Sequence, residues 1–289
     1  MSHDTIRIAP RPISINNLIE RYDALLLDAY GVLVHRDGPL PGACEFISTL
    51  KRQCKPFFIV SNTSARLPEQ AAARYQQFGF DFEPDQIITS GSLIKPCFEA
   101  MQFTGLRCAV LGPEGSFDYV KRAGGIAVRP TEDFELLVIG DQAGFPFLEW
   151  MDAAISQLIK RLDGGLSTPL ILPNPDLIYP KASGFGFTSG IMAQMIGSVL
   201  QQRYPEIKSD PFIRLGKPEP GIFEEAIQRA GTRRIIMIGD QIDTDILGAN
   251  RCGIDSALIG GGVSLPGSIP SGLATQPDYW LESLAPDAH

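Results

Sequence analysis

The 289-residue chain is short of the residues that several classes of protein require. Its five cysteines form no CxxC pair, which disfavours a disulfide framework and favours reduced thiols in a cytoplasm. Its histidines, at positions 3, 35 and 289, are too far apart in the sequence to suggest a zinc site. No apolar run is long enough to cross a bilayer and no signal-peptide pattern opens the chain, so we expect a cytoplasmic protein.

Positive charge is also scarce. The chain has 25 Lys and Arg against 33 Asp and Glu, a formal net charge of -8. Nucleic acids and membrane surfaces are bound through clustered Lys and Arg, so we expect neither as a partner. An anionic substrate would need a local positive group or a bound cation. Apolar residues, in contrast, make up 44% of the chain, which is enough for a sizeable core.

Short apolar runs alternate with helical patterns along the chain. The first part predicts buried strands at 25–27, 57–60 and 87–89, with helices at 43–52 and 68–78. This order is typical of a parallel, right-handed sheet covered by helices.

A second alternation of the same kind occupies the middle of the chain. We therefore predict an α/β fold, in which a Rossmann-like parallel-sheet core of residues 1–90 and 182–289 carries an inserted α/β unit at 91–181. Residues 1–17 are expected to be a loose lead-in, and Gly260–Gly262 a mobile loop.

Polar residues lie where several of these strands end or a helix begins. The carboxyl ends of parallel strands meet at one edge of a sheet, where ligands bind, so we expect these groups to converge. In chain order they are Asp28, Ser61–Asn62–Thr63, Lys217, and the cluster of Asp240, Asp243 and Asp245.

Such a gathering suits phosphate chemistry. Converging carboxylates repel one another unless a cation lies between them, and a few carboxylates with room for water suit Mg²⁺. Lys217 would add a second positive centre, and the Ser61 hydroxyl with the N–H groups after it could hold a phosphoryl oxygen. A carboxylate can then attack phosphorus to give an acyl phosphate, which water hydrolyses. Each group alone could be a helix cap or a solvated turn; their joint order favours the site.

These motifs resemble those of the haloacid dehalogenase (HAD) superfamily, whose members are mostly Mg²⁺-dependent phosphatases. The resemblance covers most of the chain and is greatest to the branch of nitrophenyl phosphatases and NagD-like nucleotide or sugar phosphatases. The segments that carry it are Pro39–Ala43, Ser61–Thr63, Ile87–Ser90, Gly112–Gly115, Asn174–Asp176, Gly216–Pro218 and Gly239–Asp245.

The resemblance implies roles for individual residues. Asp28 would be the nucleophile and a metal ligand, and the unit at 91–181 would be a cap that closes over the site. The other metal ligands would be Asp240, Asp245 and the backbone carbonyl of Tyr30. Phosphate or substrate would be held by Ser61, Asn62, Thr63, Lys217, Asn174 and Asp176, with Asp141, Glu114 and Gly260–Gly262 as further candidates. The aromatic side chains of Trp150, Tyr179 and Phe185 are expected to pack rather than bind ligand.

One position departs from the family pattern. Tyr30 stands where family phosphatases carry a second Asp, the general acid for the leaving group, and such acids contribute about 10²–10⁴-fold. We expect a phosphatase of small sugar, nucleotide or aryl phosphates that favours good leaving groups.

Two alternatives stay open. Asp28-Ala29-Tyr30-Gly31 also resembles the nucleophile motif of metal-free 2-haloacid dehalogenases, and the chain could be a phosphate-ligand binding protein without turnover. Both a monomer and a homo-oligomer are compatible with the sequence.

Overall fold

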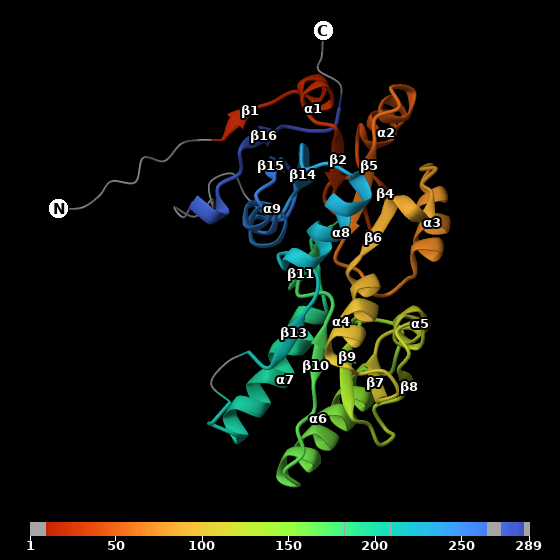
Figure 1. Ribbon diagram of the computed structural model, residues 1–289, viewed down its shortest axis with the longest axis vertical. Coiled ribbons are helices and arrows are strands. Elements are labelled where there is room, and N and C mark those ends of the chain that lie inside the picture. Colours follow the sequence, from red (N-terminus) through yellow and green to blue (C-terminus); the bar gives the residue numbers. More distant parts are fainter. Residues whose placement is uncertain (1–9, 182, 208–209, 265–272, 286–289) are drawn as a thin grey trace, which may run out of the picture.

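Two helix-covered sheets lie one above the other along the long axis of the molecule (Figure 1). The computed structural model describes residues 10–181, 183–207, 210–264 and 273–285. We refer to the upper sheet and its helices as the core and to the lower ones as the cap. The predicted α/β class with a parallel-sheet core and an α/β cap is confirmed.

The core sheet has seven parallel strands in the described residues. Its interior strand β2 has the sequence Ala-Leu-Leu-Leu and is buried throughout, as strands covered on both faces require. In sheet order the strands are β1 (Arg11–Pro12), β16 (Tyr279–Leu281), β15 (Asp255–Ile259), β14 (Ile235–Gly239), β2 (Ala24–Leu27), β5 (Phe57–Ser61) and β6 (Ile87–Thr89).

Alternate side chains of the core strands face opposite layers of helices, because the side-chain period of a strand is two. Leu25 and Leu27 pack into one apolar cluster, and Leu26 packs into the cluster on the other face. The first face is covered by α1 (Ile15–Arg21), α2 (Ala43–Arg52) and α3 (Pro68–Gln76), and the second by α8 (Pro220–Ala230) and α9 (Leu247–Cys252).

The cap repeats this arrangement with a parallel sheet of five described strands. In sheet order they are β13 (Phe212–Arg214), β10 (Leu170–Leu172), β9 (Leu136–Ile139), β7 (Arg107–Leu111) and β8 (Ile126–Val128). One face is covered by α6 (Phe147–Asp163) and α7 (Ser189–Arg203), and the other by α4 (Ile94–Met101) and α5 (Glu114–Arg122).

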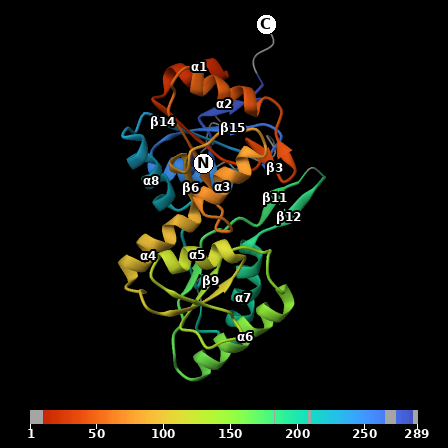
Figure 2. The ribbon, with the colours of Figure 1, turned by 90° about the vertical axis from the view of Figure 1, so that its right-hand side faces the viewer.

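Two short antiparallel hairpins lie where the core and the cap face each other. One consists of β3 (Val34–His35) and β4 (Gly38–Pro39) in the core, and the other of β11 (Ile178–Pro180) and β12 (Phe185–Phe187) in the cap. Figure 2 shows β11 and β12 projecting from the cap toward β3. Within the described residues, no helix combines the length and apolarity needed to cross a bilayer.

The predicted return to the core at residue 182 is wrong. Helix α7 buries Met192, Ile196 and Leu200 in the apolar cluster of the cap, and β13 pairs with β10 in the cap sheet. The cap therefore extends to about residue 215. The order of predicted elements could not reveal this, because the pairing partner of a three-residue strand is fixed only by the tertiary fold.

The predicted loose lead-in is also wrong for its described part. Helix α1 starts at Ile15, where the Asn17 N–H donates to the Ser14 hydroxyl, 3.3 Å away, and β1 pairs with β16. Residues 1–9 of the lead-in, and His3 and His289, lie outside the described residues.

The assignment of α7 to the cap can be tested by truncating one buried side chain. Ile196 is fully buried, so Ile196→Ala should destabilise its surroundings by about 2–5 kcal/mol. In native-state hydrogen exchange, the backbone amides of β9 and β10 should lose protection, while those of β2 and β14 should keep theirs. The matched variant Ile222→Ala, in α8, should give the reverse pattern, and equal losses in both sheets for Ile196→Ala would contradict the assignment.

Candidate active site

The site lies where the core chain reverses its direction across the sheet. Strands β2 and β14 are neighbours, but the chain proceeds from β2 toward β5 and from β14 toward β15. The loops at their carboxyl ends therefore diverge, which leaves a crevice. Asp28 directly follows β2, Asp240 directly follows β14, and the Asp28 N–H donates to the Ile238 carbonyl at 2.9 Å. The two carboxylates therefore emerge side by side.

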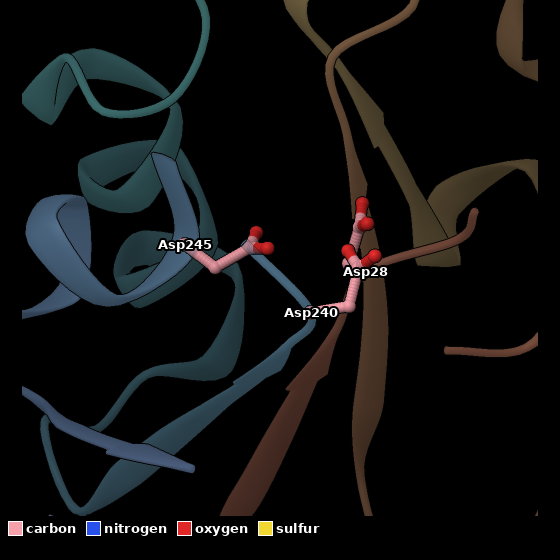
Figure 3. Close-up of side chains that lie close together, drawn as sticks. All are labelled: Asp28, Asp240 and Asp245. Carbon is pink, nitrogen blue, oxygen red and sulfur yellow. The ribbon is translucent and has the colours of Figure 1, made fainter. Parts of the chain in front are cut away.

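A third carboxylate joins this pair. Carboxylate oxygens of Asp28, Asp240 and Asp245 lie within 4.8 Å of one another, and all three residues are buried (Figure 3). Asp245 comes from a π-helical turn, Ile242–Ile246, that precedes α9. Asp243 lies in the same turn but is exposed, so it is not part of the cluster.

Lys217 offsets part of this charge. Its buried ammonium lies 2.7 Å from Asp28 Oδ1 and 2.6 Å from Asp245 Oδ1. Burial opposes the charge of Lys217, but Asp245 and Asp28 outweigh it and the net shift of its pKa is upward, so the ammonium stays charged. Burial raises the pKa of Asp28 to about 6 despite Lys217, and burial with the charge of Asp28 raises the pKa of Asp240.

The residues present fit a divalent cation. Asp240 Oδ2 accepts from the Val263 N–H at 2.8 Å, but the buried Oδ1 atom has no hydrogen-bond partner in the structure. A buried carboxylate oxygen without a partner is costly unless a cation contacts it. All donors in the cluster are oxygen atoms, the set that Mg²⁺ and Ca²⁺ prefer.

Two glycines make room for Asp240. Gly31 has φ +90°, and a Cβ there would lie 2.2 Å from Asp240 Oδ2. A Cβ on Gly262 would lie 2.2 Å from Asp240 Cβ. The predicted mobile loop at 260–262 is thus anchored at the site, since Ser264 and Val263 both donate to Asp240. The glycine run in the sequence was the signal for this close approach.

The loop after β5 faces the cavity above the cluster. Ser61, the last residue of β5, lines this cavity, and within the described chain its hydroxyl has no hydrogen-bond partner. Thr63 also lines it, and its hydroxyl accepts from the Ala65 N–H at 3.4 Å. Both remain available for a phosphoryl oxygen.

The side chain of Asn62 is hydrogen-bonded within the protein. Its Oδ1 accepts from the Lys217 N–H at 2.7 Å, and its Nδ2 donates to the Lys217 carbonyl and to Asp176 Oδ1, both at 2.9 Å. Both N–H groups of the amide are therefore used within the protein. Asn62 positions Lys217 from the neighbouring strand, which leaves no N–H of its side chain for phosphate.

The cap contributes Asn174 and Asp176 to the cavity. Asn174 Oδ1 accepts from the Asp176 N–H at 2.9 Å, which forms a tight turn and aims the Asp176 carboxylate at Asn62. Burial raises the pKa of Asp176 to about 7; Lys217 and Asn62 oppose the rise, and Asp28 and Asp245 add to it.

Tyr30 lies between Asp28 and the cap. Its ring meets Tyr179 of the β11–β12 hairpin edge to face, with the ring centroids 6.2 Å apart. Burial raises the pKa of the Tyr30 phenol, so it stays neutral near pH 7. Of the three aromatics expected only to pack, Trp150 stacks on Phe145 at 5.3 Å, Phe185 is exposed, and Tyr179 lines the cavity.

Core and cap together enclose a cavity of about 650 Å³. Asp240, Asp245 and Lys217 are buried next to it, and Asp28, Tyr30, Ser61, Asn62, Thr63, Asn174, Asp176, Asp141 and Glu114 line it. The candidates Asp243 and Gly260–Gly262 do not line it. Sequence reasoning missed three basic lining residues, Arg36, Arg66 and Arg74. The only signal was the four-residue spacing of Gln70 and Arg74, which places both on one side of α3, and Arg66 precedes that helix.

Two family models match this chain. One, described as haloacid dehalogenase-like hydrolase, matches residues 25–125, and one described as HAD-hydrolase-like matches residues 214–286. The matched segments carry every charged residue of the buried cluster. The chain belongs to the haloacid dehalogenase-like hydrolases.

Individual relatives of this hydrolase agree with the family. A dihydroxyacetone phosphatase of Corynebacterium glutamicum is 27% identical over 83% of this chain and 81% of its own. A possible sugar phosphatase of Cytophaga hutchinsonii has a TM-score of 0.84 at 29% identity, over 97% of this chain and all of its own. A p-nitrophenyl phosphatase of Archaeoglobus fulgidus has a TM-score of 0.71 at 26% identity, over 91% of this chain and 97% of its own. The predicted family branch and enzyme class are confirmed.

The cation site can be tested by unfolding. A cation present at 100 times its Kd should stabilise the hydrolase by about 2.7 kcal/mol. Asp240→Asn should lose most of this increment, and without metal it should melt higher than wild type because one buried charge is gone. Thermal melts in EDTA and in MgCl₂ measure both effects. The neighbouring exposed variant Asp243→Asn should respond to Mg²⁺ like wild type. A full Mg²⁺ response in Asp240→Asn would count against the site.

Proposed function

We propose that this hydrolase is a Mg²⁺-dependent phosphatase that cleaves small phosphate monoesters through an aspartyl-phosphate on Asp28. The observation that carries the proposal is that Asp28 meets two more acids and the ammonium of Lys217 at one buried edge. The phosphatase names of the sugar- and nitrophenyl-phosphate relatives support it.

The residues of the chain divide the work of the first step. Asp28, ionised above a pKa of about 6, attacks phosphorus through the oxygen that does not bind Lys217. Lys217 holds the other oxygen and orients the carboxylate. The Ser61 hydroxyl donates to a phosphoryl oxygen, and bound Mg²⁺ would supply the positive charge that offsets the acids and the phosphate.

Bonds and protons balance over two steps. The phosphorus–oxygen bond to the leaving group breaks as the bond to Asp28 forms, and the leaving oxygen takes a proton. Water then cleaves the aspartyl-phosphate and releases inorganic phosphate. A metal-free reaction would leave the unpartnered oxygen of Asp240 without a purpose, so the structure favours the phosphatase over the dehalogenase alternative.

The cap contains a candidate donor for the proton that the leaving oxygen takes. Tyr30 is a poor acid, because burial raises its already high pKa. Asp176 lines the same cavity, is oriented by Asn62, and has a pKa of about 7 because of its burial. An acid with a pKa near the working pH is well suited to proton transfer. We infer that Asp176 is the proton donor for esters whose leaving group needs one.

Leaving-group dependence tests the proposed reaction. p-Nitrophenyl phosphate needs little help from an acid, so it should be cleaved with a much higher kcat/KM than alkyl phosphates. Tyr30→Asp should raise kcat/KM for alkyl phosphates by about tenfold or more, up to the usual range for a general acid, whereas Tyr30→Phe should not. Phosphate release assays measure both.

The nucleophile variant is the control for that experiment. Asp28→Asn should release no phosphate from either class of ester while it still folds and binds phosphate. A wild-type protein that is stabilised by phosphate esters but releases none would favour the binding-protein alternative. Halide release from a 2-haloacid in EDTA would favour the dehalogenase.

The role of Asp176 predicts a pH dependence. The group must be protonated to donate, and its raised pKa keeps it protonated up to about pH 7. Log kcat/KM for alkyl phosphates should therefore fall as the pH rises through about 7. Asp176→Asn can still accept from Asn62. It should lower kcat/KM for alkyl phosphates and remove its fall on the alkaline limb of the pH profile, but leave kcat/KM for p-nitrophenyl phosphate unchanged. An unchanged alkaline limb in the variant would exclude Asp176 as the donor.

A further inference from the structure

The cavity contains more positive charge than a single phosphate needs. Lys217 is buried at the end of the cavity where Asp28 lies. Three arginines line the wall of the cavity: Arg36 from the β3–β4 turn, Arg66 ahead of α3, and Arg74 within α3. None of them belongs to the catalytic cluster.

These arginines lack counter-charges. In the part of the chain that the structure describes, none of the three makes an ion pair, whereas nearby Arg122 pairs with Glu69 at 3.2 Å. Among the acids that line the wall, Glu114 is paired with Lys121 at 2.8 Å.

Three other acids line the cavity. Asp28 is paired with Lys217, Asp176 accepts from Asn62, and Asp141 accepts from the Ala143 N–H at 3.0 Å and faces Arg66 without forming an ion pair with it. Within the described residues, the three guanidinium groups thus have no carboxylate bonded to them.

Arg74 is already oriented for binding. Its guanidinium carbon lies 4.3 Å from the centre of the Phe78 ring. One terminal nitrogen donates to Gln77 Oε1 at 2.9 Å, and the other to the Arg36 carbonyl at 3.4 Å. A guanidinium has five N–H groups, so donors remain for a ligand. Because the planar group is already held in place, it loses little conformational entropy when it binds one.

Arg66 and Arg74 line the same cavity as Tyr30. Both Arg66 and Arg74 act to lower the pKa of Tyr30, so their charges are close to its phenol. Tyr30 is two residues beyond the nucleophile and contacts the cap through Tyr179. A phosphate ester held at Asp28 would occupy the same cavity that these guanidinium groups line.

We propose that this wall binds a second anionic group on the leaving group of the substrate, with Arg66 and Arg74 as its principal ligands. The proposal rests on the proposed phosphatase function and names its substrate class. That class comprises phosphate esters whose leaving group carries a carboxylate or a second phosphate, in preference to esters of neutral alcohols and sugars. Both groups match the planar fork of arginine.

Paired substrates test the proposal. 3-Phosphoglycerate and glycerol 3-phosphate differ in a carboxylate, and fructose 1,6-bisphosphate and fructose 6-phosphate differ in a phosphate. In at least one pair, wild-type kcat/KM should favour the more anionic ester by about tenfold or more, the worth of one charged hydrogen bond. The pair that shows the preference identifies the anion. Raised salt should weaken the preference, because Arg36 and Arg66 are exposed.

Variants assign the preference to residues. Arg66→Gln and Arg74→Gln should each lower the ratio of kcat/KM values within the favoured pair by about tenfold. The control is Arg122, an arginine of α5 that is paired with Glu69 outside the cavity. Arg122→Gln should keep the wild-type ratio. A wild-type ratio near one in both pairs, or arginine variants that leave the ratio unchanged, would overturn the proposal.

The same experiments distinguish failure of the proposed phosphatase function from failure of the proposed anion site. If p-nitrophenyl phosphate is hydrolysed but neither pair shows a preference, the second anion site is wrong and the phosphatase stands. If no ester is hydrolysed, calorimetric binding of the two paired sets to wild type and Arg66→Gln decides the matter. Tighter binding of the more anionic ester, lost in Arg66→Gln, supports the anion site, and equal binding contradicts it.

Discussion

A single buried ammonium joins the separate parts of the active site. Lys217 bonds Asp28 at 2.7 Å and Asp245 at 2.6 Å, in surroundings from which water is excluded. A buried charge is tolerated only when partners and hydrogen bonds compensate it, so each of these groups requires the others. Asn62 fixes the backbone of Lys217 from both sides. The ends of β2 and β5, the turn before α8 and the turn before α9 are thereby held in one arrangement.

The same bonds connect the core to the cap. Asn62 binds Lys217 with one hydrogen of its amide and Asp176 with the other. The Ser64 hydroxyl donates to the Gly140 carbonyl, and the Ser116 hydroxyl donates to the Ser64 carbonyl at 2.8 Å. The closed position of the cap and the orientation of the lysine therefore depend on a few shared polar contacts next to the reacting atoms, so cap and chemistry are mechanically coupled.

The sequence was sufficient for the parts of the structure that local patterns determine. The apolar runs that became β2 and β5 predicted buried parallel strands, and the helix at 43–52 was placed with its correct bounds. The ends of strands and the start of a helix located Asp28, Asp240 and Lys217. Spacing could not separate Asp243 from Asp245, because a π-helical turn sends one outward and the other inward. The partners of Asn62 and the unpaired arginines were also out of reach, since both depend on segments distant in the chain.

The connectivity of the two sheets has a consequence for how this enzyme can diversify. The chain crosses from core to cap near residue 91 and returns near residue 215, and the cap has its own sheet and its own apolar clusters. Asp28, Lys217 and the acidic cluster all belong to the core, and the cap meets them through Asp176, which is bonded to Asn62. Insertions and deletions in parts of the cap distant from Asp176 can therefore change which substrates are admitted without moving the buried cluster. Selection can act on those parts of the cap separately from the residues around Lys217.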